Sequence, residues 1–281
     1  MTFITNPFSA LSDTIPVVAM QAYVIAMAVL VIGGTLLDVI HKKSAQYFFE
    51  NARKAKEASV RSLGAGEKGA AVVQAVAQDV LTSAEFCNPK RRIAHLLTMY
   101  GFVFFLVATV VMVFCYPASG ASTPQVWPLL WHLGALMVCV GGFWFWFFIR
   151  ADVAAEGNPW YRIVRADLFI LSLLATNLFA LDWSLLQAWG SQWSTLSLVL
   201  FIAASLVLFG GVLWSKFAHM FFKPAAAIQK RLAKADGSLD NLPEPADRTD
   251  PATRDRHSME LLKDAPLEMG LGIKREQPQH Y

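Results

Sequence analysis

The sequence predicts an all-α integral membrane protein, a bundle of five transmembrane helices with the N-terminus outside and the C-terminus inside. The first observation is composition: 55% of the residues are hydrophobic and 16% are charged, a balance too apolar for an ordinary soluble domain. The second is the length of the apolar stretches, which matches the roughly 20 residues that a helix needs to cross a bilayer. The five predicted spans lie near residues 16–39, 95–116, 126–149, 164–187 and 195–219.

The third observation is the placement of charge, which predicts the orientation. Between Arg92 and Arg150 lie 57 residues without a Lys, Arg, Asp or Glu. Three segments, 40–94, 150–163 and 216–281, contain 23 of the 24 Lys and Arg. The remaining one, Arg165, lies two residues beyond the second segment. The alternating segments 1–15, 117–125 and 188–194 hold none. Because basic loops stay in the cytoplasm, the chain is predicted to cross the cytoplasmic (inner) membrane five times, starting outside.

The chain divides into four predicted regions. Residues 1–39 form an outer N-terminus and the first helix, 40–94 a cytoplasmic amphipathic loop, 95–223 a four-helix membrane core, and 224–281 a cytoplasmic tail that is largely disordered. The first helix is predicted to be retained, because its apolar part exceeds a signal-peptide core and no Lys or Arg precedes it.

The loop at 40–94 is too long to be a simple connector. Its first helical pattern has apolar residues at Phe48, Ala52, Ala55 and Val60 among basic positions, and a second pattern follows over 67–86. One interpretation places this segment on the anionic lipid of the inner leaflet. The other makes it a docking surface for a cytoplasmic partner, with Lys90, Arg91 and Arg92 directly before the second span as the docking cluster.

Histidines at helix ends are the candidate cofactor ligands. His95 begins the second span and His219 ends the fifth, so both are predicted at the cytoplasmic level. Two imidazoles on packed helices can bind a haem iron from opposite faces. His41, at the inner end of the first span, is a spare candidate, and the alternative for all three is contact with water or lipid headgroups. His132 stands alone in the third span and is interpreted as a partner in a helix–helix hydrogen bond.

A family resemblance supports this ligand pair. Its motifs are RRIAHLLTMYGF at 91–102, RADLFILSLLATNLFAL at 165–181 and LWSKFAHMFFKP at 213–224. Over roughly 88–224 the chain resembles the haem b membrane subunits that include the nitrate reductase gamma subunit and the membrane subunits of quinone-interacting oxidoreductase and heterodisulfide reductase complexes. The resemblance implies five helices with the N-terminus outside, and a cytoplasm-proximal b-type haem with His95 and His219 as axial ligands.

The chain departs from the di-haem members of that family. Where they carry a second pair of histidines, this sequence has Phe105 and Phe201, which cannot ligate iron. The small size and reduced histidine set most resemble the membrane anchor of adenylylsulfate reductase in sulfur-oxidising bacteria. That resemblance implies a cytoplasmic flavin and iron–sulfur enzyme that oxidises sulfite to adenylylsulfate as partner, with electrons passing to quinone.

The resulting hypothesis is a membrane anchor and electron-transfer subunit with one b-type haem. No catalytic residue is assigned, because the chain has no nucleotide loop, flavin fingerprint or CxxC pair. Its predicted partners are the cytoplasmic oxidoreductase, membrane lipid and quinone, without nucleic acid; Trp, Gln and Ser at the outer helix ends could line a quinone pocket. Two alternatives stay open: a haem-free structural anchor, and a transporter or permease, which would need polar groups along a path across the membrane.

Overall fold

The all-α fold class is confirmed. The computed structural model describes residues 5–42, 44–84, 86, 88–120, 122–150, 161–212 and 219–238, and these ranges contain helices and no strand. The chain forms two compact units: Met1–Gln46 with Pro89–Lys223, called the bundle unit below, and Tyr47–Asn88 with Pro224–Tyr281, called the loop–tail unit.

Four helices of the bundle unit are long and apolar enough to cross a membrane, which supports a membrane protein. They are α2 (Val17–Lys42), α5 (Pro89–Cys115), α6 (Val126–Trp144) with its π-helical continuation η2 (Phe145–Ile149), and α8 (Leu168–Ala188). The fifth apolar helix, α9 (Ser194–Gly210), has 17 residues and is shorter than the span predicted at 195–219. It ends at consecutive glycines, Gly210 and Gly211, which carry a high conformational cost in a helix.

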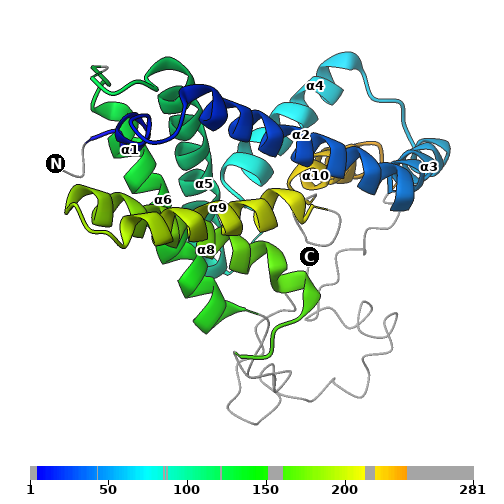
Figure 1. Ribbon diagram of the computed structural model, residues 1–281. Coiled ribbons are helices and arrows are strands. Elements are labelled where there is room, and N and C mark those ends of the chain that lie inside the picture. The colour runs from blue at the N-terminus through cyan, green and yellow to red at the C-terminus, as the bar shows by residue number, and fades with distance from the viewer. Residues whose placement is uncertain are drawn as a thin grey trace, which may run out of the picture. The chain divides into compact units, whose positions relative to one another are not determined.

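Within the bundle unit, neighbouring helices pair as hairpins. Helix α5 packs along α6 and α8 packs along α9, while α6 also contacts α8 and α2 contacts α9 (Figure 1). Two apolar clusters fill the space between them. An aromatic cluster includes Phe105 and Trp131, and a second cluster includes Phe102 and Leu208. The membrane-sized helices therefore share an interior rather than standing separately.

A short helix, α1 (Pro7–Leu11), closes one end of this interior. Asn6 caps it by accepting from the backbone N–H groups of Phe8 and Ser9, and Pro7 at its first position fits the fixed backbone angle of proline. The Asn6 amide also donates to the Tyr116 carbonyl at 2.9 Å, directly beyond α5. Phe8 and Leu11 are buried. Helix α1 is therefore held on the bundle both by the Asn6 hydrogen bond and by apolar side chains.

The loop–tail unit is held together differently, by small residues. It contains most of α3 (Ser44–Glu57), α4 (Ala65–Gln74), the π-helical η1 (Ala75–Leu81) and the part of α10 (His219–Ala235) from Pro224 onward. Its buried apolar residues are Ala55, Ala71, Ala75, Ala227 and Ala233. Helix α10 begins at His219, the residue at which the sequence predicted the last span to end, and runs to Ala235.

An arginine crosses between the two halves of the loop–tail unit. Arg231 of α10 donates to both carboxylate oxygens of Asp79 in η1, at 2.5 and 2.8 Å, and to the Gln78 side-chain oxygen at 2.9 Å. The backbone N–H of Val60 donates to the Asp236 carbonyl at 3.0 Å. Residues 47–88 of the predicted loop and the first part of the predicted tail thus form one unit.

Candidate functional site

The three candidate haem ligands lie on helix ends of the bundle unit. His95 is in the second turn of α5 and is half-buried. His41 lies one residue before the end of α2 and is exposed. His219 is the first residue of α10, and its side chain lies outside the described residues.

The face of α5 that carries His95 adjoins an apolar cluster that the start of α10 also contacts. Phe102 follows His95 by seven residues, two helical turns, and so lies on the same face of α5. Phe102 is 6% exposed and belongs to the cluster with Leu208 and Val212 of the α9 end. Met220, directly after His219, packs against this cluster. The backbone positions of the predicted pair thus adjoin one apolar cluster.

Glycines bring α6 against the segment of α5 around His95. A Cβ on Gly141 would lie 2.7 Å from the Ala94 carbonyl oxygen and 2.8 Å from Thr98 Oγ1, so only glycine fits there. Two helical turns earlier on α6, a Cβ on Gly134 would lie 2.6 Å from the Gly101 carbonyl oxygen. This glycine seam lets the two backbones touch, as small residues do between membrane helices, and it fixes where α5 presents His95.

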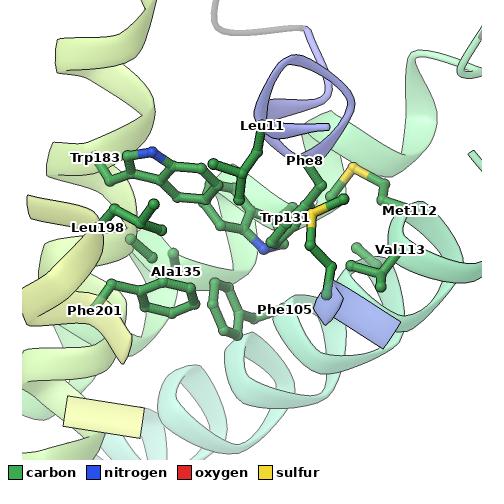
Figure 2. Packing of buried hydrophobic residues seen from close by; sticks show 13 residues of the cluster. Phe8, Leu11, Phe105, Met112, Val113, Trp131, Ala135, Trp183, Leu198 and Phe201 are labelled. Atoms are coloured by element: carbon green, nitrogen blue, oxygen red, sulfur yellow. The ribbon is translucent and has the colours of Figure 1, made fainter. Parts of the chain in front are cut away.

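The two phenylalanines at the second-haem positions lie inside the aromatic cluster (Figure 2). Phe105 and Phe201 are 4% and 8% exposed, and their ring centroids are 6.4 Å apart in an edge-to-face arrangement. Phe105 stacks on Trp131 at 5.2 Å and Phe201 stacks on Trp183 at 5.9 Å. From α1, Phe8 meets both indoles edge-on, at 5.8 and 5.5 Å. This half of the interior is occupied by side chains.

His132 uses both ring nitrogens within the bundle. Its Nδ1 lies 2.7 Å from the Pro128 carbonyl oxygen, which can only accept, so Nδ1 carries the proton. Its Nε2 lies 2.8 Å from Ser184 Oγ on α8 and accepts the hydroxyl proton. The interpretation of His132 as a helix–helix hydrogen-bonding residue is confirmed, and neither nitrogen is left for iron.

Charged residues gather at the ends of α6 and α8. Arg150 pairs with Asp167, with side chains 11% and 13% exposed, and its Nε donates to Asp167 Oδ1 at 3.1 Å. The guanidinium lies 3.9 Å from the Trp146 ring centroid. Asp167 also accepts from the Val164 backbone N–H at 2.9 Å. The pair therefore joins the end of η2 to the start of α8. Asp38, on α2, is 3% exposed.

The predicted docking cluster is only partly available at the surface. Lys90 is exposed, whereas Arg91 and Arg92 are half-buried. Arg91 Nη2 donates to the Ile149 carbonyl at 3.4 Å, which ties the start of α5 to the end of η2. A docking role for this cluster stays a prediction, with Lys90 as its most accessible member.

The described residues contain no group of three or more His, Cys, Asp or Glu that could hold a metal ion. A bis-imidazole haem site needs two ligands only, and one side chain of the predicted pair lies outside the described part. The finding therefore concerns metal sites built from three or more ligands, such as zinc or carboxylate sites, among the described residues; it does not test the predicted haem pair.

Sequence reasoning missed the role of α1. The dipeptide Asn6–Pro7 is a helix-start signal, since Asn caps well and Pro fits the first position. That signal predicts a helix but not the contacts of Phe8 with Trp131 and Trp183. The contact of Arg231 with Asp79 had no signal, because 152 residues separate the two side chains.

Comparisons with known proteins add one partial similarity. No family model matches the chain, and no solved structure matches it. Among curated proteins, it is 29% identical over 163 residues to citrate utilization protein B of Escherichia coli. The match covers 52% of this chain and 40% of that protein, so the chain spans less than half the length of its curated relative.

Proposed function

We propose that this protein is a membrane anchor and electron-transfer subunit, linking a cytoplasmic oxidoreductase to the quinone pool through one b-type haem held by His95 and His219. The observation that carries the proposal is the contrast between the two histidine positions and the two phenylalanine positions. Phe105 and Phe201 lie in a filled aromatic cluster, while His95 and the start of α10 adjoin the Phe102 cluster. This contrast supports one haem, at the histidine end, rather than two.

The donor set fits that group. Neutral imidazole is a common haem ligand, and two of them give a low-spin iron that exchanges one electron at a time. His95 is half-buried, which keeps one edge of such a site away from water. Gly141 holds α6 against Ala94 and Thr98, so the turn of α5 bearing His95 has little freedom to move. The chain's own contribution is to orient the ligands and to exclude solvent.

The proposed topology keeps five crossings. Helix α9 has 17 residues and rises about 25 Å, somewhat short of the roughly 30 Å hydrocarbon core. Residues 211–219 would complete the crossing and bring His219 to the inner interface. The one-sided placement of Lys and Arg puts the N-terminus outside and the C-terminus inside the cytoplasmic membrane.

The proposed partner is a cytoplasmic flavin and iron–sulfur oxidoreductase, with adenylylsulfate reductase as the specific candidate and sulfite as its substrate. The support is the resemblance over residues 88–224 and the absence of nucleotide, flavin and cluster motifs from this sequence. Quinone would receive the electrons in the membrane. The similarity to citrate utilization protein B covers part of each chain and carries no substrate over to this one.

An absorption spectrum of the purified full chain tests the haem. We expect a sharp reduced-minus-oxidised α band and about one haem per chain, as bis-histidine b-type sites give. His95→Ala and His219→Ala should each abolish the band. His132→Ala and His41→Ala are matched controls and should keep it, because His132 is engaged by Ser184 and His41 is exposed. A haem-free wild type, purified from haem-replete cells, would leave the structural-anchor alternative.

Recruitment of the partner is tested separately, on native membranes. Lys90→Ala combined with Arg91→Ala and Arg92→Ala should reduce the amount of flavin enzyme that co-purifies, and added salt should do the same, because exposed charges are screened within about 8–10 Å. Haem content should stay normal in this variant. Unchanged recruitment would remove the basic cluster from the docking surface without touching the haem assignment.

A further inference from the structure

The loop–tail unit leaves an apolar stripe uncovered on α4 and η1. Val72, Val73 and Val76 are 38%, 67% and 41% exposed; Val72 and Val73 are adjacent, and Val76 lies one turn further along the same side of the helix. The neighbouring face of the same helix is buried through Ala71 and Ala75. Contiguous apolar side chains at the surface of a charged unit usually mark a contact with something else. We call these three residues the valine stripe.

We propose that the valine stripe is covered by the C-terminal segment 258–273 of the same chain. The described structure ends at Ser238, within the unit that carries the stripe. The sequence continues for 43 residues from there, and its segment 258–273 is rich in apolar residues. These are Met259, Leu261, Leu262, Leu267, Met269, Leu271 and Ile273.

The point where the tail leaves favours this occupant. Val60 and Arg61 both donate their backbone N–H to the Asp236 carbonyl, at 3.0 and 3.2 Å. Arg61 in turn pairs with Glu67 in the first turn of α4, at 3.0 Å. The last described residues of α10 are thus tied, through Arg61, to the end of α4 from which the valine stripe begins.

The length of the intervening chain also fits. The 19 residues 239–257 are rich in Pro and Asp, and a random chain of that length has an end-to-end distance of roughly 25 Å. From the start of α4 to Val76 the helix rises about 17 Å. A segment beginning at residue 258 can therefore reach the whole stripe without stretching the linker.

Charge is complementary between the two surfaces. Segment 258–273 contains three acidic residues and one Lys, a net charge of −2. Residues 47–84 and 224–238 contain eight Lys and Arg against five Asp and Glu, a net charge of +3. Opposite charge favours the encounter and orients it, while the apolar side chains supply the contact. An acidic apolar segment tethered to a basic unit is held at high effective concentration.

Cross-linking of the full chain in detergent tests the contact. In a variant carrying Val73→Cys and Leu262→Cys, we expect a disulfide between these two positions within one chain, identified by mass spectrometry of the digested protein. The matched control carries Gln74→Cys in place of Val73→Cys; Gln74 is exposed on α4 and lies nearly opposite Val72 and Val76 around the helix, so it should give little product. Equal yields at both positions, or cross-links that join two chains, would overturn the proposal.

Amide exchange gives a second readout that needs no cysteine. Leu261→Asp with Leu262→Asp should raise the exchange of residues 65–81 by about tenfold, the factor that corresponds to losing roughly 1.4 kcal/mol of local protection. Leu239→Asp, in the linker, is the control and should change nothing. Exchange that is unaltered by the paired substitution would mean that lipid or detergent covers the stripe, and the tail assignment would be wrong.

Discussion

The bundle unit and the loop–tail unit are built on opposite principles. The bundle unit buries the largest side chains of the protein, with Trp131 and Trp183 fully enclosed. The buried apolar residues described in the loop–tail unit are all alanines, and the contacts across it include the pair of Arg231 and Asp79. The bundle unit is stabilised by the packing of large side chains. The loop–tail unit is stabilised by close helix contacts at alanines and by polar contacts that include an ion pair.

This difference agrees with the proposed topology, in which the bundle unit lies in lipid and the loop–tail unit in water. Between membrane-spanning helices, lipid is as apolar as the side chains, so close packing replaces the hydrophobic effect as the source of stability. Large rings interlocked at 5–6 Å and glycines that let backbones touch serve that purpose. In water, small alanine-lined contacts bury little apolar area, so ion pairs and hydrogen bonds add to the stability of a unit built from them. Substitutions that change side-chain size should therefore alter the stability of the bundle unit most, and substitutions that remove charge should alter that of the loop–tail unit.

The largest predicted effect is the loss of a ring from the bundle unit. Trp183→Ala removes a side chain that is 1% exposed and that contacts Phe8 and Phe201. Truncation of a buried aromatic ring costs about 3–5 kcal/mol through the cavity it leaves. Thermal unfolding in detergent should show a clear fall in midpoint. Trp189→Ala is the matched control, since Trp189 ends the same helix and is 71% exposed; an equal fall in both would contradict the role assigned to the cluster.

Much of the bundle unit could be predicted from the sequence, because its signals are local. Apolar length gave four of the five spans to within a few residues, except that α5 begins at Pro89 rather than 95. For the last span, predicted at 195–219, the structure describes the helix to Gly210 only, so its end stays a prediction. The residues His95 and His132 were assigned to the correct helices. The stacking of Phe105 on Trp131 was beyond reach, because it depends on how α5 and α6 meet.

The glycine seam gives the next prediction, with an internal control. Gly134→Ala should destabilise the bundle unit by about 1–3 kcal/mol, as overpacking does, because the new Cβ would lie 2.6 Å from backbone atoms of α5. Gly33→Ala on α2 meets nothing within 4 Å and should be neutral or stabilising, since alanine is the better helix former. Thermal unfolding of the two variants side by side measures the difference. Stabilisation by Gly134→Ala would show that α5 and α6 are not in backbone contact.

The smallest predicted effect concerns charge in the loop–tail unit. The hydrogen bonds from Arg231 lower the pKa of the Asp79 carboxyl below its usual value, and the positive charges of Arg231, Lys230 and Lys234 add to this against the effect of burial. Because the pKa is lower in the folded state, the carboxylate contributes stability that is present above its unfolded pKa of about 4. That contribution disappears as the pH falls through the lower, folded value.

Asp79→Asn should therefore weaken the contact of α10 with η1 at neutral pH, by about 1 kcal/mol for a partly exposed pair. Amide exchange of residues 224–235 in the full chain measures it, with wild type and variant compared at each pH so that intrinsic rates cancel. The gap between the two should be constant from pH 8 to 5 and should close below about pH 4, where the wild-type carboxyl takes up its proton. Glu57→Gln is the control: its pair with Arg53 is 3.6 Å long and 68–72% exposed, so no gap should develop. A gap that persists in acid would mean that Asp79 acts through its shape rather than its charge, and the loop–tail unit would then follow the same principle as the bundle unit.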